Sequence, residues 1–199
     1  MAESRRAVAD ALAHQREHQK LPDGGLFLIA VSGGADSLAL AWAAQFVMPR
    51  EGFEVEAVIV DHGLQDDSAQ VAATAGQTLD RMGLTATIVR VQVDGEANVE
   101  QRARDARYQA LSEVAAQRGA IGVLLGHTLN DQAETVLMGL TRGSGPASIQ
   151  GMEPVSGLWW RPFLGLTRAT TKQVCRDVGI TWWDDPHNVD HRFLRPRLR

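Results

Sequence analysis

Short apolar segments alternate with amphipathic segments along this chain of 199 residues. Four segments are continuous apolar runs or are rich in Val, Ile and Thr: residues 26–31, 55–60, 85–93 and 121–125. Such runs are typical of buried strands in a parallel sheet. Helical patterning surrounds them, at residues 5–19, 37–47, 66–82, 98–119, 130–141 and 168–178. The alternation predicts an α/β fold: an open, mostly parallel five-stranded sheet flanked by helices, with a short C-terminal helical appendage.

Polar residues follow three of the four predicted strands directly. The first strand runs into Ser-Gly-Gly at residues 32–34, the second into Asp-His-Gly at 61–63, and the fourth into Gly-His at 126–127. In open parallel sheets, ligands bind outside the carboxyl ends of the strands. The pattern therefore predicts a ligand site at one edge of the sheet.

The composition is that of an ordinary globular domain, 44% hydrophobic and 22% charged. No apolar run approaches the roughly 20 residues that a membrane span needs. The first 20 residues are too polar and too acidic for a signal or transit peptide, and we expect a cytoplasmic protein with no membrane partner. The single cysteine, Cys175, excludes a disulfide framework or a CxxC metal site within these residues.

The charge is unevenly distributed along the chain. The net charge is −4, yet the last 14 residues contain one acid, Asp190, and four arginines: Arg192, Arg195, Arg197 and Arg199. Such an end can bind nucleic-acid phosphates, or it can be the solvated end of a helix. Because the basic end stops abruptly, we expect that the natural protein continues beyond it.

The most specific motif is the loop at residues 32–37, named here the glycine loop. It follows a predicted strand, opens a predicted helix and contains Ser32, Gly33, Gly34, Ala35, Asp36 and Ser37. Adjacent glycines let backbone N–H groups face a ligand, and the helix N-terminus favours negative charge, so the loop suits phosphate or pyrophosphate. Asp36 beside a phosphate is suited to bind magnesium. The alternative is a structural turn with Asp36 or Ser37 as the N-cap.

The glycine loop resembles the SGGxDS loop of the PP-loop ATP pyrophosphatases, and it lacks the lysine of the P-loop motif GxxxxGK[ST]. Six further motifs, in order, are similar to those of the tRNA(Ile)-lysidine synthases: VDHGL at 60–64 with SA at 68–69, N-x-E-x-x-AR-x-x-RY at 98–108, GHTLNDQAET at 126–135, RGSG at 142–145, RPFL at 161–164, and DP-x-N at 185–188 with FLRPRLR at 193–199. Three positions depart from that family's pattern: Thr128, Asn130 and Pro196.

The resemblance implies the adenine nucleotide α-hydrolase-like fold and a role for each matching residue. The glycine loop with His62 and Gly63 would bind ATP, and Asp36 would hold Mg²⁺. Asp131 and Glu134 would hold and orient a substrate lysine, with Arg107 near the lysine or the phosphates and His127 in a cytosine pocket. The implied tRNA-binding residues are Arg142, Arg192, Arg195, Arg197 and Arg199. The implied division is an ATP-binding catalytic domain at 1–150 and an extension of it at 151–199, ending before further tRNA-binding domains.

Several of these residues also have a purely structural interpretation. Acids at positions 131 and 134 stabilise a helix N-terminus through its dipole. In the same helix, the spacing predicts a core-facing stripe: Ala133, Val136, Leu137 and Leu140. Glu100 and Arg104 have the spacing of a solvated ion pair. The Trp pairs at 159–160 and 182–183 suit core and interface positions better than base stacking.

The implied reaction is the synthesis of lysidine in tRNA(Ile) with a CAU anticodon. ATP would adenylate the wobble cytidine, and L-lysine would then displace AMP. The alternatives are another PP-loop ATP pyrophosphatase, such as a tRNA-thiolating enzyme or an amide-forming synthetase, or a nucleotide-binding module without catalysis. Thiolation generally needs paired cysteines or an iron–sulfur cluster, which a lone Cys175 does not provide. A homodimer is one assembly that the sequence leaves open.

Overall fold

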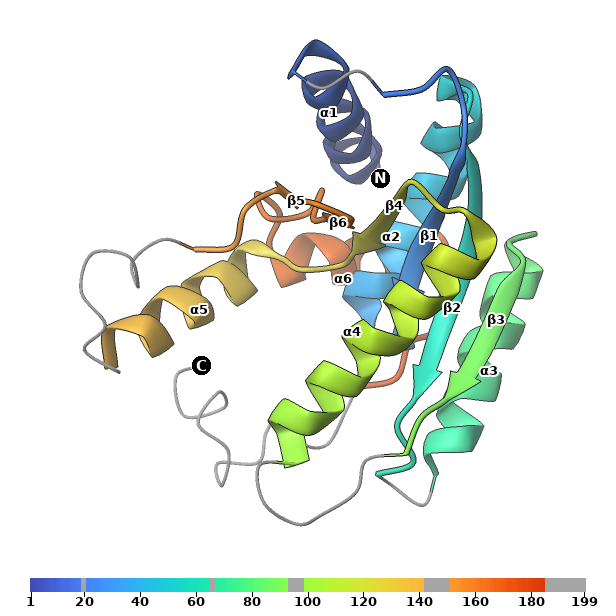
Figure 1. The fold of residues 1–199 in the computed structure, drawn as a ribbon, viewed down its shortest axis with the longest axis vertical. Helices are drawn as coiled ribbons and strands as arrows, with labels where there is room; N and C mark the ends of the chain where they lie inside the picture. Colours follow the sequence, from blue (N-terminus) through green and yellow to red (C-terminus); the bar gives the residue numbers. More distant parts are fainter. Residues whose placement is uncertain (19–20, 65–66, 93–98, 142–150, 185–199) are drawn as a thin grey trace.

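The computed structural model describes residues 1–18, 21–64, 67–92, 99–141 and 151–184. Within them, a single six-stranded sheet has the strand order β3-β2-β1-β4-β6-β5 (Figure 1). The strands are β1 (Leu26–Val31), β2 (Glu54–Asp61), β3 (Ala86–Arg90), β4 (Gly122–Leu125), β5 (Val155–Ser156) and β6 (Trp159–Trp160). All neighbours pair in parallel except β5 and β6. The predicted α/β class with a mostly parallel sheet is confirmed.

The sheet has one strand more than the five expected. The additional pairing is a short hairpin in which Val155 lies opposite Trp160 and Ser156 opposite Trp159. Gly157 opens its two-residue turn with φ +58°, as tight hairpin turns require. Strands of two residues are too short to show the alternation from which strands are predicted. The hairpin brings Trp160, 3% exposed, into the core, which confirms the core interpretation of that tryptophan.

The helices lie close to their predicted positions. They are α1 (Ala2–His18), α2 (Ala35–Val47), the 3-10 helix η1 (Met48–Glu51), α3 (Ser68–Arg81), α4 (Val99–Arg118), α5 (Leu129–Thr141) and α6 (Arg168–Asp177). In the described part of the chain, no helix is both long enough and apolar enough to cross a bilayer.

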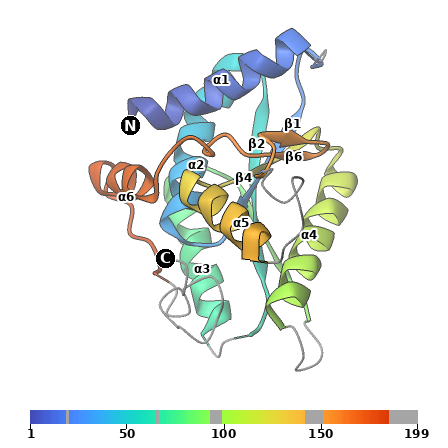
Figure 2. The same ribbon diagram turned by 90° about the vertical axis from the view of Figure 1, so that its left-hand side faces the viewer.

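Two hydrophobic cores cover the two faces of the sheet. On one face, Phe27 and Ile29 of β1 pack in the core that α1, α2, α3 and α6 complete. On the other face, Leu28 of β1 packs with Val58 and with Leu111 of α4. Figure 2 shows α2 and α3 on one side of the sheet and α4 on the other. The continuous apolar strand pattern is thus explained by burial on both faces.

The predicted core-facing stripe of α5 is wrong. Leu137 and Leu140 are 41% and 52% exposed, and Ala133 is also exposed, whereas Glu134 is 6% exposed. Helix α5 extends away from the sheet in Figure 1. Its buried side chain is that of Glu134, which contacts Arg168 of α6. The periodicity correctly predicted the helix, but the tertiary contacts decided which of its faces is buried.

The connectivity places two loops next to each other. From β1 the chain continues to β2 and β3 on one side, and it then returns to β4 on the other side of β1. The carboxyl ends of β1 and β4 therefore meet at a topological switch point, where open α/β sheets bind ligands.

Candidate functional site

The glycine loop connects β1 to α2 and is held by its own serines. The Ser32 backbone N–H donates to Ser37 Oγ over 3.1 Å, and Ser37 Oγ donates to the Gly34 carbonyl over 2.9 Å. Gly33 has φ +83°, a conformation that favours glycine. Gly34, the N-cap residue, offers no side chain to the first N–H groups of α2, which leaves them to a ligand.

The loop after β4 lies directly against the glycine loop. A Cβ atom added to Gly126 would lie 3.1 Å from the backbone carbonyl carbon and oxygen of Asp36 and from the Cα atom of Ser37. A side chain at position 126 would therefore push against backbone. This close approach is the physical reason for a glycine between β4 and His127.

Three acids predicted from the sequence meet around one arginine. Arg168, at the start of α6, places its Nη2 atom 2.5 Å from Asp131 Oδ1, its Nη1 atom 2.9 Å from Glu134 Oε1 and its Nε atom 3.7 Å from Asp36 Oδ2. The Arg168 side chain is 24% exposed and that of Glu134 only 8%. One guanidinium faces three carboxylates, so the cluster keeps an excess of negative charge.

Asp131 is held ionised by its neighbours. The backbone N–H and the hydroxyl of Thr128 donate to Asp131 Oδ2 over 2.7 and 2.8 Å. Burial alone would raise the pKa of Asp131, but the Thr128 bonds, Arg168 and His127 outweigh it and lower that pKa. A partly buried, ionised carboxylate is suited to bind a substrate cation.

The pKa of Asp36 is shifted in the opposite direction to that of Asp131. Its Oδ1 atom accepts a hydrogen bond from the Thr171 hydroxyl. Burial, together with the negative charge of Asp131, raises the pKa of Asp36, and the Thr171 bond and Arg168 only partly offset this rise. The ionised Asp36 would therefore be stabilised by an additional cation.

Arg107 of α4 acts on two predicted histidines. Burial, opposed by Asp131 and reinforced by Arg107, lowers the pKa of His127 to about 4. Burial and then Arg107 also lower the pKa of His62. Both imidazoles are thus neutral at pH 7, and each has a buried Nδ1 atom without a hydrogen-bond partner among the described residues. Neutral imidazoles can donate to or accept from a base.

The end of β2 contributes a tight turn to the same edge of the sheet. The Gly63 backbone N–H donates to Asp61 Oδ1 over 3.0 Å, and Gly63 has φ +62°. The buried Asp61 therefore shapes the backbone at the predicted His62–Gly63 part of the ATP site.

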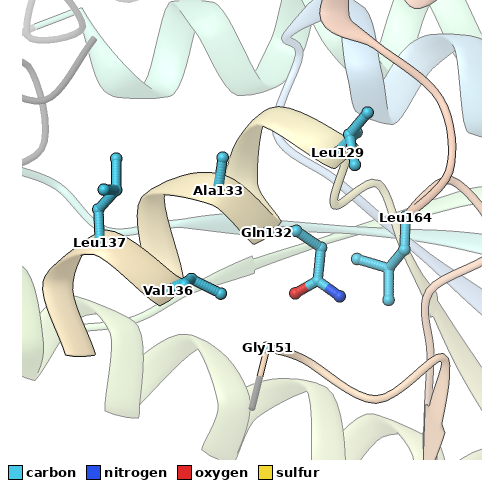
Figure 3. Close-up of a pocket in the computed structure, with 7 residues that line it drawn as sticks. All are labelled: Leu129, Gln132, Ala133, Val136, Leu137, Gly151 and Leu164. Atoms are coloured by element: carbon cyan, nitrogen blue, oxygen red, sulfur yellow. The ribbon is translucent and has the colours of Figure 1, made fainter. Parts of the chain in front are cut away.

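An apolar hollow of about 530 Å³ lies beside α5 (Figure 3). Its lining residues are Leu129, Gln132, Ala133, Val136, Leu137, Gly151 and Leu164. Gln132 holds the chain at one side of it, since its side chain accepts from the Met152 N–H and donates to the Met152 carbonyl. None of the described residues that line the hollow is charged, so this lining differs in chemistry from the acidic cluster.

Comparison with protein families identifies the family of this chain. Residues 6–199 match the family described as the PP-loop domain. The chain belongs to the PP-loop family. The glycine loop at residues 32–37 lies within the matched range and is called the PP loop from here on.

Curated relatives of this PP-loop chain share one name. A tRNA(Ile)-lysidine synthase from Leifsonia xyli is 54% identical over 185 residues, which cover 92% of this chain and 55% of that protein. One from Salinispora tropica is 46% identical over 205 residues, covering 100% of this chain and 60% of that protein. The chain thus spans little more than half the length of these relatives.

Solved structures agree with the PP-loop fold. The U34-tRNA thiolase NcsA from Methanococcus maripaludis superposes with a TM-score of 0.78 at 17% identity, covering 99% of this chain and 70% of that chain. NMN synthetase from Francisella tularensis superposes with a TM-score of 0.62 at 14% identity, covering 90% and 71%. At these identities the likeness concerns the fold alone.

The structure brings together some of the predicted site residues and leaves others untested. Asp36, Asp131 and Glu134 share one cluster, and Arg107 is within electrostatic reach of both His62 and His127. The predicted tRNA-binding residues lie outside the described residues: Arg142, Arg192, Arg195, Arg197 and Arg199. The Glu100 side chain of the expected ion pair and the departing position Pro196 also lie outside them.

Sequence reasoning missed four residues of the PP-loop site. Arg168 and Thr171 come from α6, and Thr128 and Asn130 were noted only as departures from a family pattern. Asn130 Oδ1 accepts from the Arg168 backbone N–H over 3.0 Å, and Thr128 holds Asp131. Arg168 did carry a signal, because a cation in the first turn of a helix opposes the helix dipole and needs a compensating partner.

Proposed function

We propose that this chain is the PP-loop part of a tRNA(Ile)-lysidine synthase. The observation that carries the proposal is the meeting of Asp36 with Asp131 and Glu134, which places the PP loop beside a partly buried acidic pair. The names of relatives about 50% identical to the chain support it. A nucleotide and a substrate amine would then bind next to each other, as this reaction requires.

The proposed reaction has two steps. First, the C2 carbonyl oxygen of the wobble cytidine bonds to the α-phosphorus of ATP, the α–β phosphoanhydride bond breaks, and pyrophosphate leaves. Next, the ε-ammonium of L-lysine loses a proton to water and the resulting neutral amine attacks C2. The C2–oxygen bond breaks, AMP leaves with that oxygen, and the attacking nitrogen loses a second proton to water. The chain's contribution is positioning and charge complementarity rather than covalent catalysis.

Each part of the site has a role in this proposal. The helix N-terminus after the PP loop binds the phosphates, with Ser32 as a hydroxyl donor. Ser37, whose hydroxyl donates to the Gly34 carbonyl, shapes the loop. Asp131 and Glu134 attract and orient the lysine ammonium, because their negative charges are complementary to its positive charge. Neutral His62 and His127 serve as hydrogen-bonding groups on the adenine side and the cytosine side.

Asp36 is suited to hold magnesium together with substrate phosphates. Among the described residues, no three His, Cys, Asp or Glu side chains form a metal site of their own. Magnesium in nucleotide enzymes is commonly held by one or two carboxylates plus phosphate oxygens, so a single Asp36 beside the PP loop fits it. When bound there, the ion would neutralise charge on the phosphates.

The thiolation alternative gains no support from the cysteine. Cys175 is fully buried and donates to the Ala35 carbonyl at 3.4 Å. Burial, with a contribution from Asp36, raises the pKa of Cys175 to about 11. A buried thiol with a raised pKa is a poor nucleophile.

The deciding experiment is transfer of labelled L-lysine to unmodified tRNA(Ile) with a CAU anticodon, in the presence of ATP and Mg²⁺. Label in the tRNA, with AMP as the nucleotide product, supports the proposal. The assay is run with the 199 residues and with a version extended to the length of the relatives. If neither version transfers label, the lysidine proposal is refuted.

A further inference from the structure

Arg168 contacts both the acid of the PP loop and the acidic pair of α5. Its three nitrogen atoms each face a different carboxylate, at 2.5 Å for Asp131, 2.9 Å for Glu134 and 3.7 Å for Asp36. Asp36 belongs to α2 and the other two acids to α5. No role was assigned to Arg168 by the sequence motifs.

Arg168 is itself held in place by both neighbouring helices. Its backbone N–H donates to Asn130 Oδ1 over 3.0 Å. The Thr171 hydroxyl donates to Asp36 and lies 2.9 Å from the Arg168 carbonyl oxygen. After α6, the Trp183 N–H donates to the Gly33 carbonyl in the PP loop over 3.0 Å. Helix α6 therefore bridges the PP loop and α5, and the guanidinium cannot move without disturbing both.

The position of Arg168 is unfavourable for its helix. It is the first residue of α6, where the helix dipole disfavours a cation. Only its carboxylate partners compensate for this. A planar guanidinium can direct N–H groups at three acids at once, which the single ammonium of lysine cannot do in the same geometry.

The charge balance leaves the site ready for substrate. Three carboxylates against one guanidinium retain enough negative charge for a further cation, so Arg168 spaces the acids without cancelling them. Because Arg168 contacts all three acids, a change at Asp36 on nucleotide binding would alter the contacts of Arg168 with Asp131 and Glu134.

We propose that Arg168 is a positioning residue that couples nucleotide binding at the PP loop to amine binding at Asp131 and Glu134. The inference rests on the proposed function and adds a mechanism of communication to it. The negative phosphates of the nucleotide attract the Arg168 guanidinium and weaken its hold on Asp131 and Glu134. Nucleotide should therefore tighten lysine binding. Couplings of this kind are typically 5- to 150-fold in affinity, and they are reciprocal.

The test measures lysine affinity by calorimetry on the 199-residue chain, with and without Mg²⁺ and α,β-methylene-ATP. We expect nucleotide to tighten lysine binding by about fivefold or more in the wild type. The ratio of lysine affinities with and without nucleotide, named here the coupling factor, should fall to about one in R168Q and at least by half in R168K. R176Q is the matched control, because Arg176 lies on the same helix with an exposed side chain over Trp182. It should keep the wild-type factor.

A merely structural role for Arg168 would lower the melting temperature without abolishing the coupling factor in the folded protein. A wild-type coupling factor in folded R168Q, or in R168K if R168Q does not fold, overturns the inference. Lysine and nucleotide binding without coupling in the wild type also overturns it. If the wild type binds neither ligand, the proposed function fails, and the inference fails with it.

Discussion

Replacing Glu134 with glutamine tests the acidic pair directly. The change removes one charge from a side chain that is 8% exposed and 2.9 Å from Arg168, while the side chain keeps nearly the same shape. Glutamine still offers an oxygen to Arg168, but a neutral acceptor forms a bond about half as strong as a charged one. We therefore expect a loss of about 1 kcal/mol in the free energy of unfolding.

The functional effect should be much larger than the structural one. At about 4 Å and an effective dielectric constant near 20, a carboxylate and an ammonium attract each other by about 4 kcal/mol. Losing most of that attraction should slow lysine transfer by roughly a hundred- to a thousandfold. Adenylation should change little, because Arg168 keeps both Asp131 and Asp36 as partners.

The assay separates the two steps in single turnovers. Pyrophosphate release reports adenylation, and labelled lysine in tRNA(Ile) reports transfer, in whichever version of the protein transfers lysine. Glu113→Gln, an exposed acid on α4 that accepts from Gln109, is the matched control. Loss of adenylation in folded Glu134→Gln would show that the acidic pair serves ATP, and unchanged lysine transfer would refute its proposed role.

Three further predictions concern Asp36, His127 and Gly126. Asp36→Asn should abolish AMP formation, because Asp36 is proposed to hold magnesium; turnover near the wild-type rate would contradict that role. The same variant should have a higher melting temperature, because the raised pKa of Asp36 means that its charge is unfavourable in the folded state. The pKa of His127 is about 4, below its ordinary 6.5, so its contribution to the free energy of unfolding is present above pH 6.5 and is lost as the pH falls toward 4. Urea unfolding should show a free energy of unfolding about 2 kcal/mol lower at pH 5 than at pH 7. His127→Asn should remove that difference. Gly126→Ala should slow adenylation at least about tenfold, because its Cβ would press on the Asp36 backbone. Gly165→Ala, where the Cβ meets open space, should leave the rate unchanged. Equal adenylation rates in the two variants would refute the close-approach argument.

Local pattern was sufficient for most of the architecture. The continuous apolar runs predicted the central strands because β1, β2 and β4 are buried on both faces. The glycine loop predicted a helix N-terminus because Gly33 needs a positive φ and α2 begins directly after Gly34. The polar residues after β1 and β4 were predicted to meet because parallel strands place their carboxyl ends at one edge.

Tertiary structure decided what lies between those elements. The spacing in α5 is the same whether Leu137 or Glu134 faces inward, and the ion pairs with Arg168 of α6 are on the acidic side, where Glu134 is buried. The β5–β6 hairpin depends on pairing with β4 rather than on its own two-residue strands.

Arg168 marks the limit of what the sequence alone determines. It lies 132 positions after Asp36 and 34 after Glu134, and only folding brings these charges together. A sequence identifies which residues can bind phosphate or carry charge. Which acids share one cation depends on distances in space, because electrostatic interactions act across the fold and not along the chain.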